Sequence, residues 1–167
     1  MSVKVYAPRK SYGWLFLALL VFLLFFSGFF LVHVYFATGN AVLLISAFPS
    51  FGFGIPFLVI LFGLRTMRYE LDDENLVMKY RFIKYIVPFS SIKRITKRDL
   101  EISLWSSFRL PGLALFTVPY SDVGKVKMCA TSASRGIILI ETDRGVYGIT
   151  PLDEDAFIAD LKSRIRD

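Results

Sequence analysis

The sequence predicts an α+β protein in which a hairpin of two transmembrane helices precedes a mostly-β domain that ends in a helix. Three observations predict this fold class. Residues 11–64, a run of 54 positions, contain no Asp, Glu, Lys or Arg; all 14 acidic residues follow residue 64; and apolar residues alternate along the chain beyond Met67. A chain of 167 residues is too short to enclose this apolar block in a soluble core, whereas a lipid bilayer can hold it.

Charge divides the chain into three parts. The tail of residues 1–13 carries a net charge of +3 from Lys4, Arg9 and Lys10, the block of residues 14–64 carries none, and the remainder carries +3. We expect residues 67–166 to form one small domain with its own core. The basic flanks of membrane spans explain the isoelectric point near 9.5, so no nucleic-acid partner is expected.

The apolar block predicts two helices, at about residues 14–36 and 42–64. The first has 23 residues, or about 35 Å of helix, and aromatic residues mark both of its ends. It is too long for the apolar core of a signal peptide. Pro49 and Pro56 interrupt the second run. We therefore expect a kinked or partly irregular helix packed against the first, with a re-entrant loop as the alternative.

The charges beside the two helices predict their orientation. Lys4, Arg9 and Lys10 precede the first helix, and Arg65 and Arg68 follow the second. The connection between the helices contains no Lys or Arg. By the positive-inside rule, the protein is expected to cross the cell membrane twice with both termini in the cytoplasm. His33 lies near the end of the first span, beside Tyr35, where we interpret it as an interfacial anchor rather than a proton relay.

Beyond Met67 the sequence predicts about seven strands and a closing helix. Two predicted strands flank an acidic turn at residues 72–75, and a third covers residues 84–89. Residues 91–103 are expected to form a short turn and then another strand. The remaining predicted strands cover residues 126–131, 136–142 and 146–150. Pro88 suggests an edge or a strand end. Asp153 is the expected N-cap of the helix, which has an apolar stripe at Phe157, Leu161 and Ile165.

An ordered set of segments carries a family resemblance. The segments are Tyr69-Glu-Leu-Asp-Asp-Glu-Asn-Leu-Val-Met-Lys, Val87-Pro-Phe-Ser-Ser-Ile, Arg109-Leu-Pro-Gly, Lys125-Val-Lys-Met-Cys-Ala-Thr, Ile138-Leu-Ile-Glu-Thr-Asp-Arg-Gly and Tyr147-Gly-Ile-Thr-Pro-Leu-Asp. Together they resemble the bacterial and archaeal pleckstrin-homology-like (PH-like) domains that follow two membrane helices, over roughly residues 67–164. The resemblance implies a split barrel of two sheets with the C-terminal helix capping one end, and it supplies no catalytic residues.

The residues themselves indicate no enzyme, metal site or cofactor. The charged region contains no His, the commonest general base, and no phosphate- or dinucleotide-binding motif. Its paired carboxylates, at residues 72–74 and 153–155, have the positions of a turn and of a helix N-terminus. The single cysteine, Cys129, lies in an alternating segment, and we interpret it as a buried apolar residue.

Two groups of basic residues are candidates for contact with the anionic lipid surface. They are Lys79, Arg81 and Lys84, and then Lys93, Arg94, Lys97 and Arg98. A basic residue close to an anionic membrane contributes about 1 kcal/mol of binding. Recognition of a specific headgroup and a merely solvated face are the alternatives.

A long apolar segment, residues 104–120, supplies candidates for contact with a membrane or a partner. They are Trp105, Phe108, Leu110 and Phe116. The alternative is that this segment forms strands and a buried connection.

These features predict a non-enzymatic integral membrane protein. Its cytoplasmic PH-like domain would bind a protein partner, another copy of itself or the anionic membrane surface. The alternative is an accessory subunit of a transport or channel assembly that oligomerises through its transmembrane helices. We expect that removal of residues 1–66 releases a folded, soluble domain.

Overall fold

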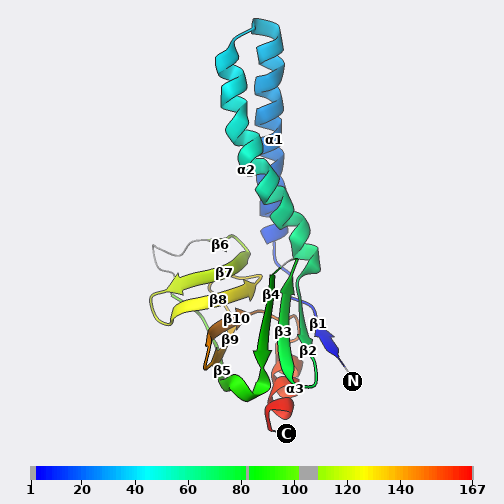
Figure 1. The fold of residues 1–167 in the computed structure, drawn as a ribbon, viewed down its shortest axis with the longest axis vertical. Helices are drawn as coiled ribbons and strands as arrows, with labels where there is room; N and C mark the ends of the chain where they lie inside the picture. Colours follow the sequence, from blue (N-terminus) through cyan, green and yellow to red (C-terminus); the bar gives the residue numbers. More distant parts are fainter. Residues whose placement is uncertain (1–2, 82, 102–108, 167) are drawn as a thin grey trace. The chain divides into compact units, whose positions relative to one another are not determined.

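The computed structural model describes residues 3–81, 83–101 and 109–166, and the chain divides into two compact units (Figure 1). The helical unit is Trp14–Arg65. The β-domain combines Met1–Gly13 with Thr66–Asp167. It therefore contains both chain segments that flank the helical unit in the sequence.

The helical unit consists of α1 (Gly13–Thr38), α2 (Ala41–Gly63) and the short 3₁₀ turn η1 (Leu64–Thr66). Both helices agree with the expected ranges within two residues, and both are long and apolar enough to cross a membrane. Between them, the Asn40 side chain caps α2 by accepting a hydrogen bond from the backbone N–H of Val42 (3.1 Å). Pro49 and Pro56 lie inside α2, which continues through both as one helix. The structure therefore has a helix rather than a re-entrant loop at this position.

The two helices pack through small residues and aromatic side chains. The ring of Phe51 lies edge-on to Phe25, with 5.9 Å between the ring centroids. A Cβ atom at Gly28 would lie 2.9 Å from the Phe51 ring, so a larger residue there would displace this ring. The hydroxyl oxygens of Ser27 and Ser50 are 3.2 Å apart and share a hydrogen bond. The predicted packing of the second helix on the first is confirmed.

Two sheets and one helix make up the β-domain (Figure 1). The first sheet has the order β1-β2-β3-β4 and consists of Lys4–Tyr6, Arg68–Leu71, Asn75–Tyr80 and Ile83–Pro88. After the 3₁₀ turn η2 (Phe89–Ser91), the second sheet has the order β5-β9-β10-β8-β7-β6. Its strands in sequence order are β5 (Ile92–Arg98), β6 (Arg109–Leu110), β7 (Leu113–Tyr120), β8 (Gly124–Ala130), β9 (Ile137–Thr142) and β10 (Gly145–Ile149). All neighbouring strands are antiparallel except β8 and β10, which are parallel.

The described residues contain ten strands, where the sequence suggested about seven. One of the additional strands, β1, comes from the tail that charge alone had separated from the domain. Lys4 pairs with Leu71, and Tyr6 with Tyr69, so residues 4–6 form an edge of the first sheet. Three residues are too few to show a period, and only the free edge of β2 makes this segment a strand. The strands β6 and β7 lie in the apolar segment 104–120, whose first part is outside the described residues.

Burial explains the most apolar strand and the position of the helix. Residues 137–140 of β9 are fully buried on both faces of the sheet, which accounts for the unbroken apolar run there. The helix α3 (Glu154–Arg166) begins as expected, because a carboxylate oxygen of Asp153 accepts a hydrogen bond from the Ala156 backbone N–H (3.1 Å). Its Phe157 and Leu161 are fully buried. The predicted N-cap and the inner face of this helix are confirmed.

Candidate binding surface

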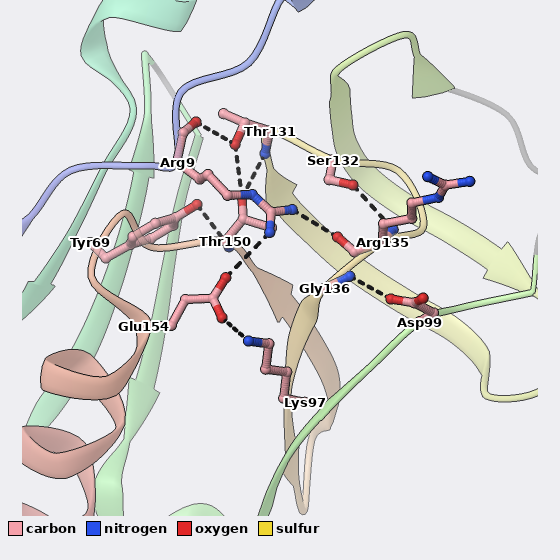
Figure 2. A network of polar contacts seen from close by, with 10 residues as sticks. All are labelled: Arg9, Tyr69, Lys97, Asp99, Thr131, Ser132, Arg135, Gly136, Thr150 and Glu154. Carbon is pink, nitrogen blue, oxygen red and sulfur yellow. Dashed lines mark hydrogen bonds and ion pairs between the residues drawn. The ribbon is translucent and has the colours of Figure 1, made fainter.

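A polar cluster around Arg9 anchors the N-terminal segment to the β-domain (Figure 2). The Arg9 guanidinium donates to the backbone carbonyl of Arg135 (2.7 Å) and lies 3.3 Å from a carboxylate oxygen of Glu154. Lys97 forms an ion pair with the other carboxylate oxygen of Glu154, and this hydrogen-bonded pair raises the pKa of the Lys97 ammonium. One carboxylate at the start of α3 thus holds both the tail and strand β5.

Buried hydroxyl groups continue this cluster into the domain. The Tyr69 hydroxyl donates to the carbonyl of Cys129 (2.7 Å) and accepts a hydrogen bond from the backbone N–H of Thr150 (3.3 Å). The Thr131 hydroxyl donates to the carbonyl of Arg9 (2.7 Å). Burial raises the pKa of Tyr69 far above its ordinary value, so its hydroxyl stays protonated. These contacts pair buried polar groups and stabilise the fold.

The structure separates the seven basic residues into two groups. The first group, Lys79, Arg81 and Lys84, lies at the turn between β3 and β4, whereas Lys93, Arg94, Lys97 and Arg98 lie on β5. The part of β4 beyond Lys84 and the turn η2 lie between the groups, and a strand of six residues spans roughly 20 Å. Figure 1 shows the β3–β4 turn and the beginning of β5 at opposite ends of β4. Lys93 and Arg94, at the beginning of β5, therefore lie about one strand length along the chain from the first group.

Ion pairs offset much of this positive charge. Four of the seven residues are paired: Lys79 with Glu70 (2.6 Å), Lys93 with Asp143 (2.5 Å), Arg98 with Asp122 (2.7 Å), and Lys97 with Glu154. Although burial raises the pKa of Glu70, hydrogen bonds from Lys79 and Arg68 outweigh that effect and leave it below its ordinary value. The carboxylate thus stays ionised opposite its lysine at neutral pH.

The apolar candidates have different positions. Trp105 and Phe108 lie outside the described residues. Leu110 ends the two-residue strand β6 and is partly buried. Phe116 lies in β7 with 39% of its surface exposed and with a φ of 62°, a left-handed conformation that is uncommon for a bulky residue. Both described residues lie in strands of the second sheet, and contact of the exposed Phe116 with a membrane or a partner stays a prediction.

A groove of about 190 Å³ lies between β5 and the C-terminal half of α3. It is lined by Ile92, Lys93, Arg94, Ile95, Lys162 and Ile165. The sequence shows the isoleucines only as apolar anchors and Lys162 only as a charge near the end of the helix. The lining residues of β5 and α3 are far apart in the chain and form one groove because α3 packs beside β5. The periodicity of the sequence does not indicate this contact.

Two other interpretations from the sequence agree with the structure. Cys129 is 1% exposed, and burial raises the pKa of its thiol to about 12, which leaves it protonated. In the acidic turn, a carboxylate oxygen of Asp72 accepts hydrogen bonds from the backbone N–H groups of Glu74 (2.9 Å) and Asn75 (2.5 Å). Both residues thus have structural positions in the β-domain.

Comparisons with known proteins address the family rather than the ligand. Searches of curated proteins and of solved structures found no significant match to this chain. The family model described as "Bacterial PH domain" matches residues 67–165. That range extends from just before β2 into the last turn of α3, and it includes both sheets apart from the N-terminal strand β1. The chain therefore belongs to the bacterial PH domain family, with two long apolar helices preceding the domain.

Proposed function

We propose that this chain is a non-enzymatic integral membrane protein whose PH domain lies in the cytoplasm and binds a protein partner. Its two apolar helices, joined by the uncharged residues 39–40, supply the membrane hairpin. The basic residues flank this hairpin on the side of the two chain termini, which favours a cytoplasmic domain by the positive-inside rule.

The ion pairs between these basic side chains and carboxylates favour a protein partner over a lipid surface. Four of the seven basic residues are paired with carboxylates, and the seven are divided between the β3–β4 hairpin and β5. A basic residue near an anionic membrane contributes about 1 kcal/mol, and a carboxylate beside it offsets part of that attraction, which disfavours a firm hold on lipid. A protein partner can instead use hydrogen bonds and shape, which need little net charge.

Vesicle flotation tests this choice. A soluble version, with residues 1–12 joined by a flexible linker to residues 66–167, is mixed with neutral or anionic vesicles, and circular dichroism checks its folding. The proposal expects no difference between the two lipids, and none between the wild type and a variant with Lys93, Arg94, Lys97 and Arg98 replaced by Ala. Flotation on anionic vesicles alone, lost in that variant, would overturn the protein partner in favour of lipid.

Cysteine labelling tests the side of the membrane. The native Cys129 is buried, so a maleimide is expected to label only a cysteine introduced at an exposed position. Lys84→Cys and Lys125→Cys, at exposed residues of two different strands, are expected to react with an impermeant maleimide only after the cells are permeabilised. Labelling of intact cells would place the domain outside and contradict the orientation.

The helical hairpin is better explained as an anchor than as an oligomerisation interface. Small and hydroxyl-bearing residues hold membrane helices together, and here Gly28, Gly54, Ser27 and Ser50 make their contacts within one chain. The assembly subunit remains the competing proposal. Discrete cross-linked homo-oligomers joined through the helices in native membranes would favour it.

A further inference from the structure

The strand β5 is an edge of the six-stranded sheet. It pairs with β9 on one side only, from Ile92 opposite Thr142 to Arg98 opposite Ile137. In an antiparallel pair, every second residue directs its backbone N–H and C=O away from the partner strand. Within the described part of the chain, no backbone hydrogen bond is made on the other side of residues 93–98. This edge can therefore accept another strand.

The groove between β5 and α3 runs along this edge. Four consecutive residues of β5, from Ile92 to Ile95, line it. Successive side chains of a strand point to opposite faces, so a groove bordered by all four follows the edge of the sheet rather than one face. At its other side it is bounded by Lys162 and Ile165 of α3. An added strand would thus meet side chains from both elements.

The lining of the groove has a defined chemistry. Three of its residues are isoleucines and three are basic, namely Lys93, Arg94 and Lys162. Lys93 is paired with the exposed Asp143, whereas Arg94 and Lys162 have no ion pair among the described residues. The groove therefore complements a segment that alternates apolar with acidic side chains.

We propose that the protein partner binds here by strand addition, as an extended acidic segment that pairs with the edge of β5. This inference rests on the proposed function and identifies the surface and the kind of partner. Backbone hydrogen bonds to β5 would supply affinity, and contacts with Arg94, Lys162 and the isoleucines would supply selectivity.

A second copy of this chain does not fit the same edge. Four of the seven residues of β5 are basic, so two β5 strands side by side would place Lys and Arg near one another. The charge of the edge thus discourages self-association and favours an acidic partner.

Selection from a random 12-residue peptide display library tests the proposal. The bait is the full chain in nanodiscs of zwitterionic lipid. Selected peptides are expected to share acidic residues at alternate positions. The variant Arg94→Glu/Lys162→Glu should weaken their binding by at least about tenfold, because it places like charges in contact. The matched control Lys84→Glu/Lys125→Glu changes the net charge equally at exposed sites outside the groove and should bind as the wild type does.

Methylation of the peptide backbone tests the binding mode. Strand addition uses the N–H of every second peptide residue, so N-methyl groups should abolish binding at alternate positions and be tolerated between them. Equal effects at all positions would overturn strand addition. Failure to enrich acidic peptides, or binding that the Arg94→Glu/Lys162→Glu variant retains at equal thermal stability, would overturn the site.

The failure of this site can be distinguished from the failure of the proposed function. If selection fails while flotation is equal on neutral and anionic vesicles, the site is wrong and a protein partner elsewhere stands. If anionic vesicles bind the soluble version and the Arg94→Glu/Lys162→Glu variant loses them, the ligand is lipid and both proposals fail.

Discussion

The side chain of Tyr6 fastens the N-terminal segment to the β-domain. Tyr6 is 8% exposed, and its ring lies edge-on to Phe157 with 5.1 Å between the ring centroids. Its hydroxyl donates a hydrogen bond to the carboxylate of Asp160. Burial, and then the neighbouring Asp160, raise the pKa of Tyr6, so the hydroxyl remains a donor at neutral pH. We predict that Tyr6→Ala detaches the strand β1 from the first sheet.

The size of the effect follows from this burial. Truncation of a buried aromatic residue to Ala costs about 3–5 kcal/mol, and an edge position, which can partly close, favours the lower value. A loss of about 3 kcal/mol in the free energy of local opening corresponds to roughly 100-fold faster exchange of the protected amides. The neighbouring Val5 is the matched control, because it is 57% exposed on the opposite face of β1.

Hydrogen–deuterium exchange of the full chain in nanodiscs measures this difference. The amides of residues 4–6 and of β2 should exchange roughly 100-fold faster in Tyr6→Ala than in the wild type. Val5→Ala should change them by no more than about threefold, as expected for an exposed position. Unprotected amides at residues 4–6 in the wild type, or equal effects of the two substitutions, would show that this segment is a separate tail.

Three further predictions concern the β-domain. A fragment that begins at residue 67 lacks β1 and Arg9. Its midpoint of thermal unfolding should be lower than that of the soluble version in which a linker joins residues 1–12 to residues 66–167. Equal midpoints would refute this prediction. Tyr69→Phe removes a buried hydroxyl that bonds to the Cys129 carbonyl and the Thr150 N–H, and it should lower the free energy of unfolding by about 2–3 kcal/mol. The control Tyr85→Phe removes a hydroxyl that makes no hydrogen bond in the described part of the chain. It should lower the free energy of unfolding by under about 0.5 kcal/mol. Lys4, and then the Tyr6 hydroxyl, hold the pKa of Asp160 below its ordinary value, so its contribution to stability is present above about pH 4 and is lost as the pH falls through the folded pKa. Thermal unfolding of Asp160→Asn should therefore depend less on pH in the acid range than that of the wild type, and an unchanged slope would contradict the role of this carboxylate.

Most of the secondary structure could be predicted because it depends on short-range patterns. The apolar residues of β3 and β8, the buried run of β9 and the carboxylate cap of α3 each leave a local signal. The two apolar helices are similarly evident from the absence of charge. The parallel pairing of β10 with β8 is not evident, because adjacent segments would be expected to pair as hairpins and a crossover leaves no local mark.

The charged residues were predicted less well for the same reason. Lys93, Lys97 and Arg98 are visible as a basic run, but their partners Asp143, Glu154 and Asp122 lie far along the chain. Carboxylates beside a run of basic residues weaken its attraction to an anionic membrane. Pairing depends on which strands and helices become neighbours, so the sequence could not show which basic residues have carboxylate partners.

The sequence by itself determined that the chain has a charge-free helical hairpin followed by a β-domain with a closing helix. Those features depend on composition and on periods of two and 3.6 residues, which each segment carries within itself. Only the tertiary structure decided that residues 4–6 complete a sheet, that carboxylates offset much of the basic charge, and that α3 lies beside the edge of β5 to form a groove. These are contacts between distant segments, and a sheet edge or a groove exists only once the chain has brought its borders together.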